Sequence, residues 1–133
     1  MSDNSGEDIR RKVMSDAFVD RALANTDELT APLQDYINDH CWGATWTRDG
    51  IDLKTRSLVT IAMLAALKAP TELKGHIRGA LNNGATVEEV REVLLHSAVY
   101  CGAPAAQEAF RAFKEVVQSL QADESCATNG SAI

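Results

Sequence analysis

An aliphatic run near the middle of the chain constrains the fold more than any other feature of the sequence. Residues 58–67 read Leu-Val-Thr-Ile-Ala-Met-Leu-Ala-Ala-Leu, so a helix formed here has apolar side chains on nearly every side. Asp52 precedes the run and is a good helix N-cap, which predicts a helix over 53–68. A helix of this kind has to be covered all round. It therefore belongs at the centre of the fold or in a subunit interface.

The best-defined local structure is a helical hairpin that follows this segment. Its first helix begins near Pro70 and ends before Gly84, which can take the left-handed conformation common just past a helix end. Its second helix opens with a capping box formed by Thr86 and Glu89 and runs toward Tyr100. Apolar residues at helical spacing predict three further helices, over 7–24, 28–43 and 104–120.

No stretch alternates in the manner of a strand, so the predicted fold is all-α with about six helices in one domain over 1–121. Between the second and third helices, Gly43 and residues 47–50 are predicted to break the helix and form a loop that carries Trp42, Trp46 and Arg48. Residues 122–133 are small or polar and have no apolar face to bury. They are predicted to be a disordered tail.

Composition and charge exclude several classes of function. The formal net charge of −6 argues against a nucleic-acid-binding protein, because phosphate contacts need clustered Lys and Arg. No apolar run approaches the roughly 20 residues needed to span a bilayer, and the N-terminal segment is not a signal peptide, so we expect a cytoplasmic protein. Cys41, Cys101 and Cys126 form no Cys-x-x-Cys pair and no zinc-ligand pattern. We expect reduced thiols, with Cys41 and Cys101 as small core residues.

Titratable residues indicate two places where chemistry is possible. Glu72 and His76 are four residues apart and share a helix face, which suits either a surface pair or a proton-transfer site with the imidazole pKa adjusted toward neutral pH. Arg56 lies in the first turn of the apolar helix, and a guanidinium there needs an anionic partner, either a structural carboxylate or a ligand. His96 lies within an apolar helix and is predicted to be a core or interface histidine.

Several catalytic motifs are absent from the sequence. It contains no Gly-x-Ser-x-Gly, Gly-x-Gly-x-x-Gly, P-loop or His-Glu-x-x-His pattern. Most hydrolase, nucleotide-dependent and metalloprotease functions are therefore excluded.

Five segments together resemble the carboxymuconolactone decarboxylase family within the alkylhydroperoxidase D-like superfamily, and the resemblance as a whole spans about residues 13–117. They are the Trp-Gly and Trp-Thr-Arg pieces at 42–43 and 46–48, Asp-Leu-Lys-Thr-Arg-Ser-Leu at 52–58, Glu-Leu and His at 72–76, Ala-Leu-Asn-Asn-Gly at 80–84, and Ala-Val-Tyr-Cys-Gly-Ala-Pro-Ala-Ala at 98–106. The resemblance implies an alkylhydroperoxidase D-like helical fold and a homo-oligomer, either a hexamer or a trimer of dimers. It also implies no cofactor and no metal.

The activity implied by the resemblance is decarboxylation of 4-carboxymuconolactone to β-ketoadipate enol-lactone, in the protocatechuate branch of aromatic degradation. The substrate class is a small dicarboxylate lactone. His76 would donate the proton and Glu72 would orient it, while the substrate would be held or shielded from water by Arg56, Arg48, Arg78, Trp42, Trp46 and Tyr100. The alternatives are a protein of the same fold that acts on a related lactone, or a non-catalytic binding or assembly protein.

The peroxidase branch of the superfamily is excluded by the residues near His76. That branch resembles alkylhydroperoxidase D and depends on Cys-x-x-Cys-x-x-x-His, whose two cysteine positions fall here on Ala69 and Glu72. A thiol peroxidase is therefore not expected. Two departures from the decarboxylase pattern are Asp49, where relatives often carry Pro, and Gln107, where they often carry Asn.

Overall fold

The computed structural model describes residues 4–131, with side chains over 4–125. In this part the chain forms helices and no strands, which confirms the all-α prediction. The helical segments are α1 (Ser5–Met14), α2 (Asp16–Ala24), α3 (Ala31–Tyr36), the π-helical η1 (Ile37–Trp46), α4 (Leu53–Ala66), α5 (Pro70–Asn82), α6 (Val87–Cys101) and α7 (Ala103–Ser131).

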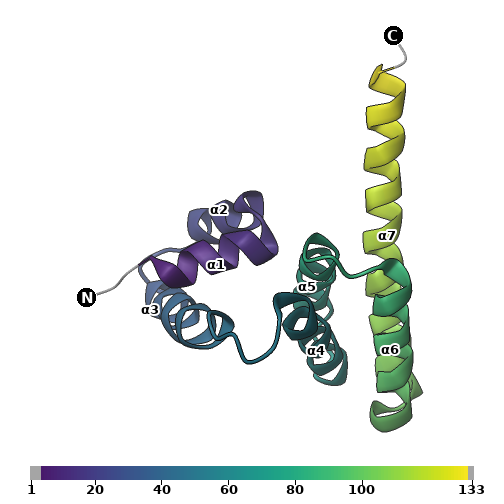
Figure 1. Ribbon diagram of the computed structural model, residues 1–133, viewed down its shortest axis with the longest axis horizontal. Coiled ribbons are helices and arrows are strands. Elements are labelled where there is room, and N and C mark those ends of the chain that lie inside the picture. Colours follow the sequence, from purple (N-terminus) through teal and green to yellow (C-terminus); the bar gives the residue numbers. More distant parts are fainter. Residues whose placement is uncertain (1–3, 132–133) are drawn as a thin grey trace.

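The helices form three groups along the longest axis of the molecule (Figure 1). Helices α1, α2, α3 and η1 lie on one side, α4 and α5 lie in the middle, and α6 and α7 lie on the far side. The main core lies between α4, α5, α6 and α7, and its largest fully buried side chains are Ile61, Leu73, Ile77, Leu94, Val90 and Val116. A second apolar cluster joins α1 to η1 around Val13, Met14 and Trp42.

Local capping signals are confirmed in the middle and far groups. The Asp52 carboxylate accepts a hydrogen bond from the Thr55 backbone N–H at 2.7 Å and starts α4. Thr86 and Glu89 form both bonds of the predicted capping box, each 3.0 Å long. Gly84 has a φ of 94°, which explains why α5 ends where it does.

The prediction of one helix over 7–24 is wrong, because the chain breaks at Ser15. This residue has a φ of 97°, and its hydroxyl accepts a hydrogen bond from the Phe18 N–H, so it caps α2 rather than continuing α1. The break lets Val13 at the end of α1 and Val19 in α2 both become fully buried. Burial of two β-branched side chains thus outweighs the strained backbone between them.

The predicted loop is confirmed over residues 47–52, which include Arg48, but the placement of both tryptophans in it is wrong. Trp42 and Trp46 lie on η1, which continues from α3 with the wider turn of a π-helix through Gly43. Gly43 does not break the helix. It is needed because α1 crosses η1 here and the two backbones are almost in contact. A Cβ on Gly6 would lie 1.9 Å from the Asn38 carbonyl oxygen, and one on Gly43 would lie 3.6 Å from the Gly6 Cα.

Two other expectations, for the C-terminal tail and for His96, differ at least in part from the structure. Helix α7 continues to Ser131, whereas a disordered tail is predicted over 122–133, of which 132–133 lie outside the described residues. Residues 121–125 are exposed, so this part of the helix rests on local propensity rather than on packing. His96 is exposed on the outer face of α6, so it is not a core histidine of this chain, and its predicted alternative place in a subunit interface stays a prediction.

The predicted burial of the cysteines is wrong as well. Cys41 and Cys101 are both exposed free thiols, because each lies on the side of its helix turned away from the apolar clusters. The side chain of Cys126 lies outside the described residues. No helix within residues 4–131 has both the length and the apolar character needed to cross a membrane.

The Gly6 crossing gives a direct test of the α1–η1 contact. We expect Gly6→Ala to lower the free energy of unfolding by about 2 kcal/mol, because the new methyl group has to push α1 away from η1. Gly50→Ala is the matched control, since a Cβ there has no atom within 4 Å. Urea denaturation followed by circular dichroism measures both. Equal stability of the two variants would contradict the crossing.

Candidate active site

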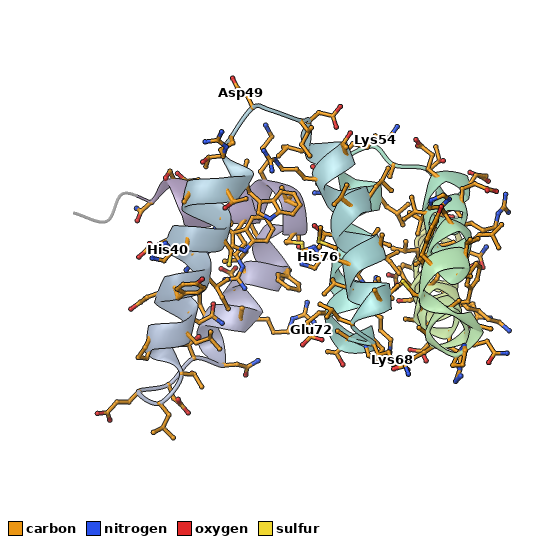
Figure 2. The ribbon with its side chains drawn as sticks, turned by 90° about the horizontal axis from the view of Figure 1, so that it is seen from below. His40, Asp49, Lys54, Lys68, Glu72 and His76 are labelled. Atoms are coloured by element: carbon orange, nitrogen blue, oxygen red, sulfur yellow. The ribbon has the colours of Figure 1, made fainter. Side chains whose placement is uncertain are left out.

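His76 lies on α5 and faces the N-terminal helices (Figure 2). Its ring is nearly parallel to that of Trp42, with an interplanar angle of 3° and centroids 6.2 Å apart. The Trp46 ring lies 6.3 Å from it and stacks on Trp42 at 4.6 Å. The structure thus brings together the predicted histidine and both predicted tryptophans, in an aromatic layer between η1 and α5.

The imidazole of His76 is held in its neutral form. Burial, the nearby Arg10 guanidinium and a smaller opposing effect of Glu72 together lower the pKa of His76 from 6.5 to about 4. Its Nδ1 atom is buried and has no hydrogen-bond partner in the part of the chain that the structure describes. This corrects the expectation that the Glu72 pair adjusts the pKa toward neutral pH. Desolvation has the larger effect, because Glu72 itself is exposed.

Glu72 shares a face of α5 with His76, as predicted, but no hydrogen bond joins the two among the described residues. The carboxylate lies in the first turn of α5, where a negative charge is favoured by the helix dipole. In the structure as it stands, Glu72 acts on His76 only through the field of its charge.

Arg10 is the residue of this region that sequence reasoning missed. Its side chain is only 6% exposed, and its Nη1 donates to Gln34 Oε1 at 2.9 Å and to Asn38 Oδ1 at 3.0 Å. Its guanidinium lies over the Phe18 ring, 5.9 Å from the centroid. Both oxygens are neutral amide oxygens, and Arg10 has no ion pair with any residue that the structure describes.

Two observations show that the Arg10 charge is only partly compensated by the residues around it. Burial lowers the pKa of its guanidinium, and its Nε atom is buried without a hydrogen-bond partner. A usable signal exists in the sequence, since Arg10 follows Gly6 by four residues and precedes Met14 by four, on the buried face of α1.

Arg56 and Arg48 are brought together at the junction of η1 and α4. The Arg56 Nη2 atom donates to the Arg48 backbone carbonyl at 3.1 Å, and the Arg56 Nε atom is buried without a partner. A cavity of about 440 Å³ opens beside this junction and is lined in part by Trp46, Arg48 and Asp52. The Arg48 side chain is exposed and makes no ion pair with Asp49.

Arg78 and Tyr100 are not placed near His76. Arg78 donates to the Ser119 hydroxyl on α7 at 3.3 Å, so it lies on the α7 side of α5. Tyr100 is 79% exposed on α6 and contacts only the His96 ring, at 5.4 Å between centroids, among the aromatic residues. Within the described residues, no three or more His, Cys, Asp or Glu side chains gather in a way that could hold a metal ion.

Comparison with known proteins places this arrangement in a family. The family model described as the carboxymuconolactone decarboxylase family matches residues 31–115. The chain belongs to the carboxymuconolactone decarboxylase family. The match includes η1 with both tryptophans, Arg56 and His76, whereas Arg10 precedes it.

Two relatives with assigned activities are both decarboxylases. The chain is 40% identical over 117 residues to the nitrosuccinic acid decarboxylase of Metarhizium robertsii, covering 88% of this chain and 82% of the relative. It is 39% identical over 115 residues to the 4-carboxymuconolactone decarboxylase of Acinetobacter baylyi, covering 86% of each. This member of the carboxymuconolactone decarboxylase family is therefore a carboxy-lyase.

The lowered pKa of His76 predicts how the stability of this decarboxylase depends on pH. The unfolded chain takes up a proton near pH 6.5 and the folded chain only near pH 4, so the contribution of His76 is complete above about pH 6.5 and is lost as the pH falls toward 4. Relative to His76→Gln, the wild type should lose roughly 2 kcal/mol of unfolding free energy between about pH 7 and pH 4.5. Chemical denaturation of both proteins at several pH values measures this difference in unfolding free energy. Parallel pH profiles of the two proteins would contradict the buried neutral imidazole.

A second prediction concerns Arg10. Replacing it as Arg10→Met removes a positive charge near His76 while keeping an apolar stem in the same space. The pKa of His76 should rise above about 4 but stay below 6.5, because burial is the larger cause of the shift. The NMR chemical shifts of the His76 ring protons report the pKa. An unchanged value would show that Arg10 does not act on His76.

Proposed function

We propose that this decarboxylase removes carbon dioxide from 4-carboxymuconolactone without a cofactor and forms β-ketoadipate enol-lactone. One observation carries the proposal: a neutral imidazole lies in an aromatic layer near the buried Arg10 guanidinium, and neither Arg10 nor the half-buried Arg56 has a carboxylate partner among the described residues. Cations in such an environment favour an anionic ligand, and a dicarboxylate supplies two negative charges.

The reaction requires an electron sink and a proton. When carbon dioxide leaves this lactone, the bonding electron pair passes through the ring double bond into the lactone carbonyl and forms a dienolate. A proton then has to be added to ring carbon, so the balance is one proton taken up for each carbon dioxide released. The protein needs to stabilise the oxyanion, supply the proton and keep water away from the leaving carboxylate.

We propose that His76 handles the proton, and that it starts as a neutral imidazole rather than as a charged imidazolium acid. Its imidazole is neutral in the free enzyme and can donate an N–H hydrogen bond to the carbonyl oxygen where negative charge develops. A dianionic substrate placed beside it would raise its pKa, since an opposite charge favours imidazolium. It would then take up a proton and pass it to carbon. Glu72 would help through its negative charge.

Arg56 and Arg48 are proposed to bind one carboxylate of the substrate at the junction of η1 and α4. Arg56 has a free buried Nε and is held in place by the Arg48 carbonyl, so its fork is already oriented. Arg10, bonded to Gln34 and Asn38, adds positive potential at His76. Trp42, which is 5% exposed, and the half-buried Trp46 would shield the leaving carboxylate from water.

Nitrosuccinic acid is the second candidate substrate, favoured by the 40% identity to the enzyme named for it. It is also a small dicarboxylate in which an electron-withdrawing group accepts the electron pair, a nitro group in place of the conjugated lactone carbonyl. Both compounds therefore need the same two features from the site, cationic binding of carboxylates and delivery of a proton to carbon.

Parallel assays with the two compounds test the proposal. The purified chain is incubated with each under saturating conditions, and carbon dioxide release and the product are followed. Formation of the enol-lactone, at a kcat/KM at least about tenfold above that for nitrosuccinate, is the expected result. Turnover of nitrosuccinate alone would assign the second substrate, and no turnover of either would refute both.

Replacing His76 should lower turnover far more than binding. We expect His76→Gln to reduce kcat by about 10²–10⁴-fold with KM changed only a few-fold, because the proton is needed in the transition state rather than in the ground state. His40→Gln, an exposed histidine on η1, is the matched control and should keep full activity. Steady-state kinetics of the two variants measure the difference. A fully active His76→Gln enzyme would remove this residue from the mechanism.

The proposal includes a homo-oligomer, a hexamer or a trimer of dimers, acting in the cytoplasm on an intermediate of the protocatechuate branch of the β-ketoadipate pathway. Support for association comes from exposed apolar side chains on neighbouring helices α4 and α6, where Met63, Leu67 and Val99 are 59%, 73% and 75% exposed.

A further inference from the structure

Two adjacent asparagines end α5, the helix that carries His76, and each bonds to a different neighbouring helix. Asn82 is the last residue of α5, and Asn83 follows it as the C-cap. Helix α5 packs against both α1 and α4. These two neighbours carry the guanidinium groups of the candidate site, Arg10 on α1 and Arg56 on α4.

Asn82 holds the end of α1. Its Nδ2 atom donates to the Lys12 and Val13 carbonyls at 2.9 and 3.0 Å. Helix α1 ends at Met14, and carbonyls in the last turn of a helix have no partner within that helix. One amide group therefore satisfies two backbone acceptors and uses both of its N–H donors.

The bonds of Asn82 are possible because α1 lies very close to α5. Gly79 is one turn before Asn82, and a Cβ on it would lie 2.9 Å from the Met14 Sδ atom. Arg10 precedes Met14 by four residues, on the buried face of the same helix. The position of this part of α1 therefore sets the distance between the Arg10 charge and His76.

Asn83 holds the first half of α4. Its Nδ2 atom donates to the Ser57 Oγ atom at 3.2 Å, and Ser57 is fully buried. Ser57 directly follows Arg56, so the bond fixes the turn of α4 from which the Arg56 side chain starts. An ion pair between Lys54 and Glu89 joins the same end of α4 to α6, but both side chains are more than a third exposed, so it contributes little.

We propose that Asn82 and Asn83 are separate positioning residues for the two guanidinium groups of the site. Asn82 fixes Arg10 relative to His76 by holding α1, and Asn83 fixes Arg56 by holding α4. Hydrogen bonds are directional, so they limit the sliding and rotation of packed helices that apolar contacts allow. The role of Asn82 does not depend on the substrate, whereas an effect of Asn83 on substrate binding rests on the proposed function.

NMR spectroscopy tests the role of Asn82 without a substrate. The charges that act on His76 are Arg10 of α1 and Glu72 of α5. Asn82→Leu removes both donors without a change in charge, so α1 should move and the pKa of His76 should rise by at least about 0.5. In an Arg10→Met background the same substitution should shift this pKa less than half as much, because the charge that Asn82 positions is then absent.

The same spectra test the role of Asn83. Asn83→Leu should leave the pKa of His76 within about 0.2 of the wild-type value and should instead move the Arg56 Nε–H resonance. Ser57→Ala removes the other partner of the bond and should move that resonance too, and the double variant should add nothing further. Asn25→Leu makes the same chemical change at an exposed position at the end of α2 and is the matched control.

Kinetics separate positioning from a general loss of stability. With the compound that the enzyme decarboxylates, Asn83→Leu and Ser57→Ala should each raise KM about tenfold and change kcat only a few-fold, since Arg56 binds the substrate in ground and transition states alike. Asn82→Leu should instead lower kcat about tenfold, since it acts through His76. Absence of turnover of both candidate substrates would refute the proposed function and leave the NMR results to decide on the asparagines.

Two results would overturn the proposal. One is a His76 pKa that Asn82→Leu leaves unchanged, or shifts equally with and without Arg10. The other is an Arg56 resonance that Asn83→Leu leaves in place, or that Asn82→Leu moves as far. Asn82→Ala and Asn83→Ala also remove the donors, and they replace any leucine variant that circular dichroism shows to be unfolded.

Discussion

Helix α1 is held on both sides by contacts that leave almost no space between it and its neighbours, and the site depends on this. On one side its Gly6 meets the Asn38 carbonyl and Gly43 of η1. On the other, Asn82 of α5 donates to the Lys12 and Val13 carbonyls at 2.9 and 3.0 Å. Helix α1 contacts both η1, which carries the tryptophans, and α5, which carries His76. Its position therefore sets the distance between these two helices and so the width of the aromatic layer.

The charge states around the aromatic layer are determined more by burial than by ion pairs. The Arg10 and Arg56 guanidinium groups have neutral oxygens as hydrogen-bond partners, and each keeps a buried Nε without a partner. Such an arrangement costs free energy in the empty protein, and a negatively charged ligand offsets part of that cost. Burial, and to a smaller extent the Arg10 charge, keeps the His76 imidazole neutral. Under the proposed function, a bound anion would raise the pKa of His76, which would couple the charge of the ligand to the proton affinity of the imidazole.

Local signals in the sequence correctly predicted helix caps and turns, whose stability depends on interactions between residues close together in the chain. The Asp52 cap, the Thr86 and Glu89 capping box and the turn at Gly84 involve residues within a few positions of one another, and all three are present. The break at Ser15 and the π-helical η1 could not be predicted in this way, because they come from packing between segments far apart in the sequence. Gly43 shows the difference, since a glycine that permits a crossing looks like one that ends a helix.

The same limit applies to the site. His76 and the tryptophans were found through motifs, whereas Arg10 belongs to none of these motifs and is buried. Arg78 and Tyr100 were assigned from the family resemblance, and in this chain they lie on other faces. Tertiary structure sets the distance of a residue from the reacting group. Spacing along one helix predicts only which residues share a face of that helix.

The π-helical turn of η1 has one more consequence. A π-helical stretch amounts to an α-helix with residues inserted, and its side chains are rotated relative to those of a regular helix. Trp42 and Trp46 stack at 4.6 Å in this wider turn, and His76 lies 6.2 and 6.3 Å from them. The number of residues between 37 and 46, and not only their identity, therefore determines which way the rings point. Within this family, a gain or loss of one residue in that stretch would re-aim the indole rings without changing any side chain that touches the ligand.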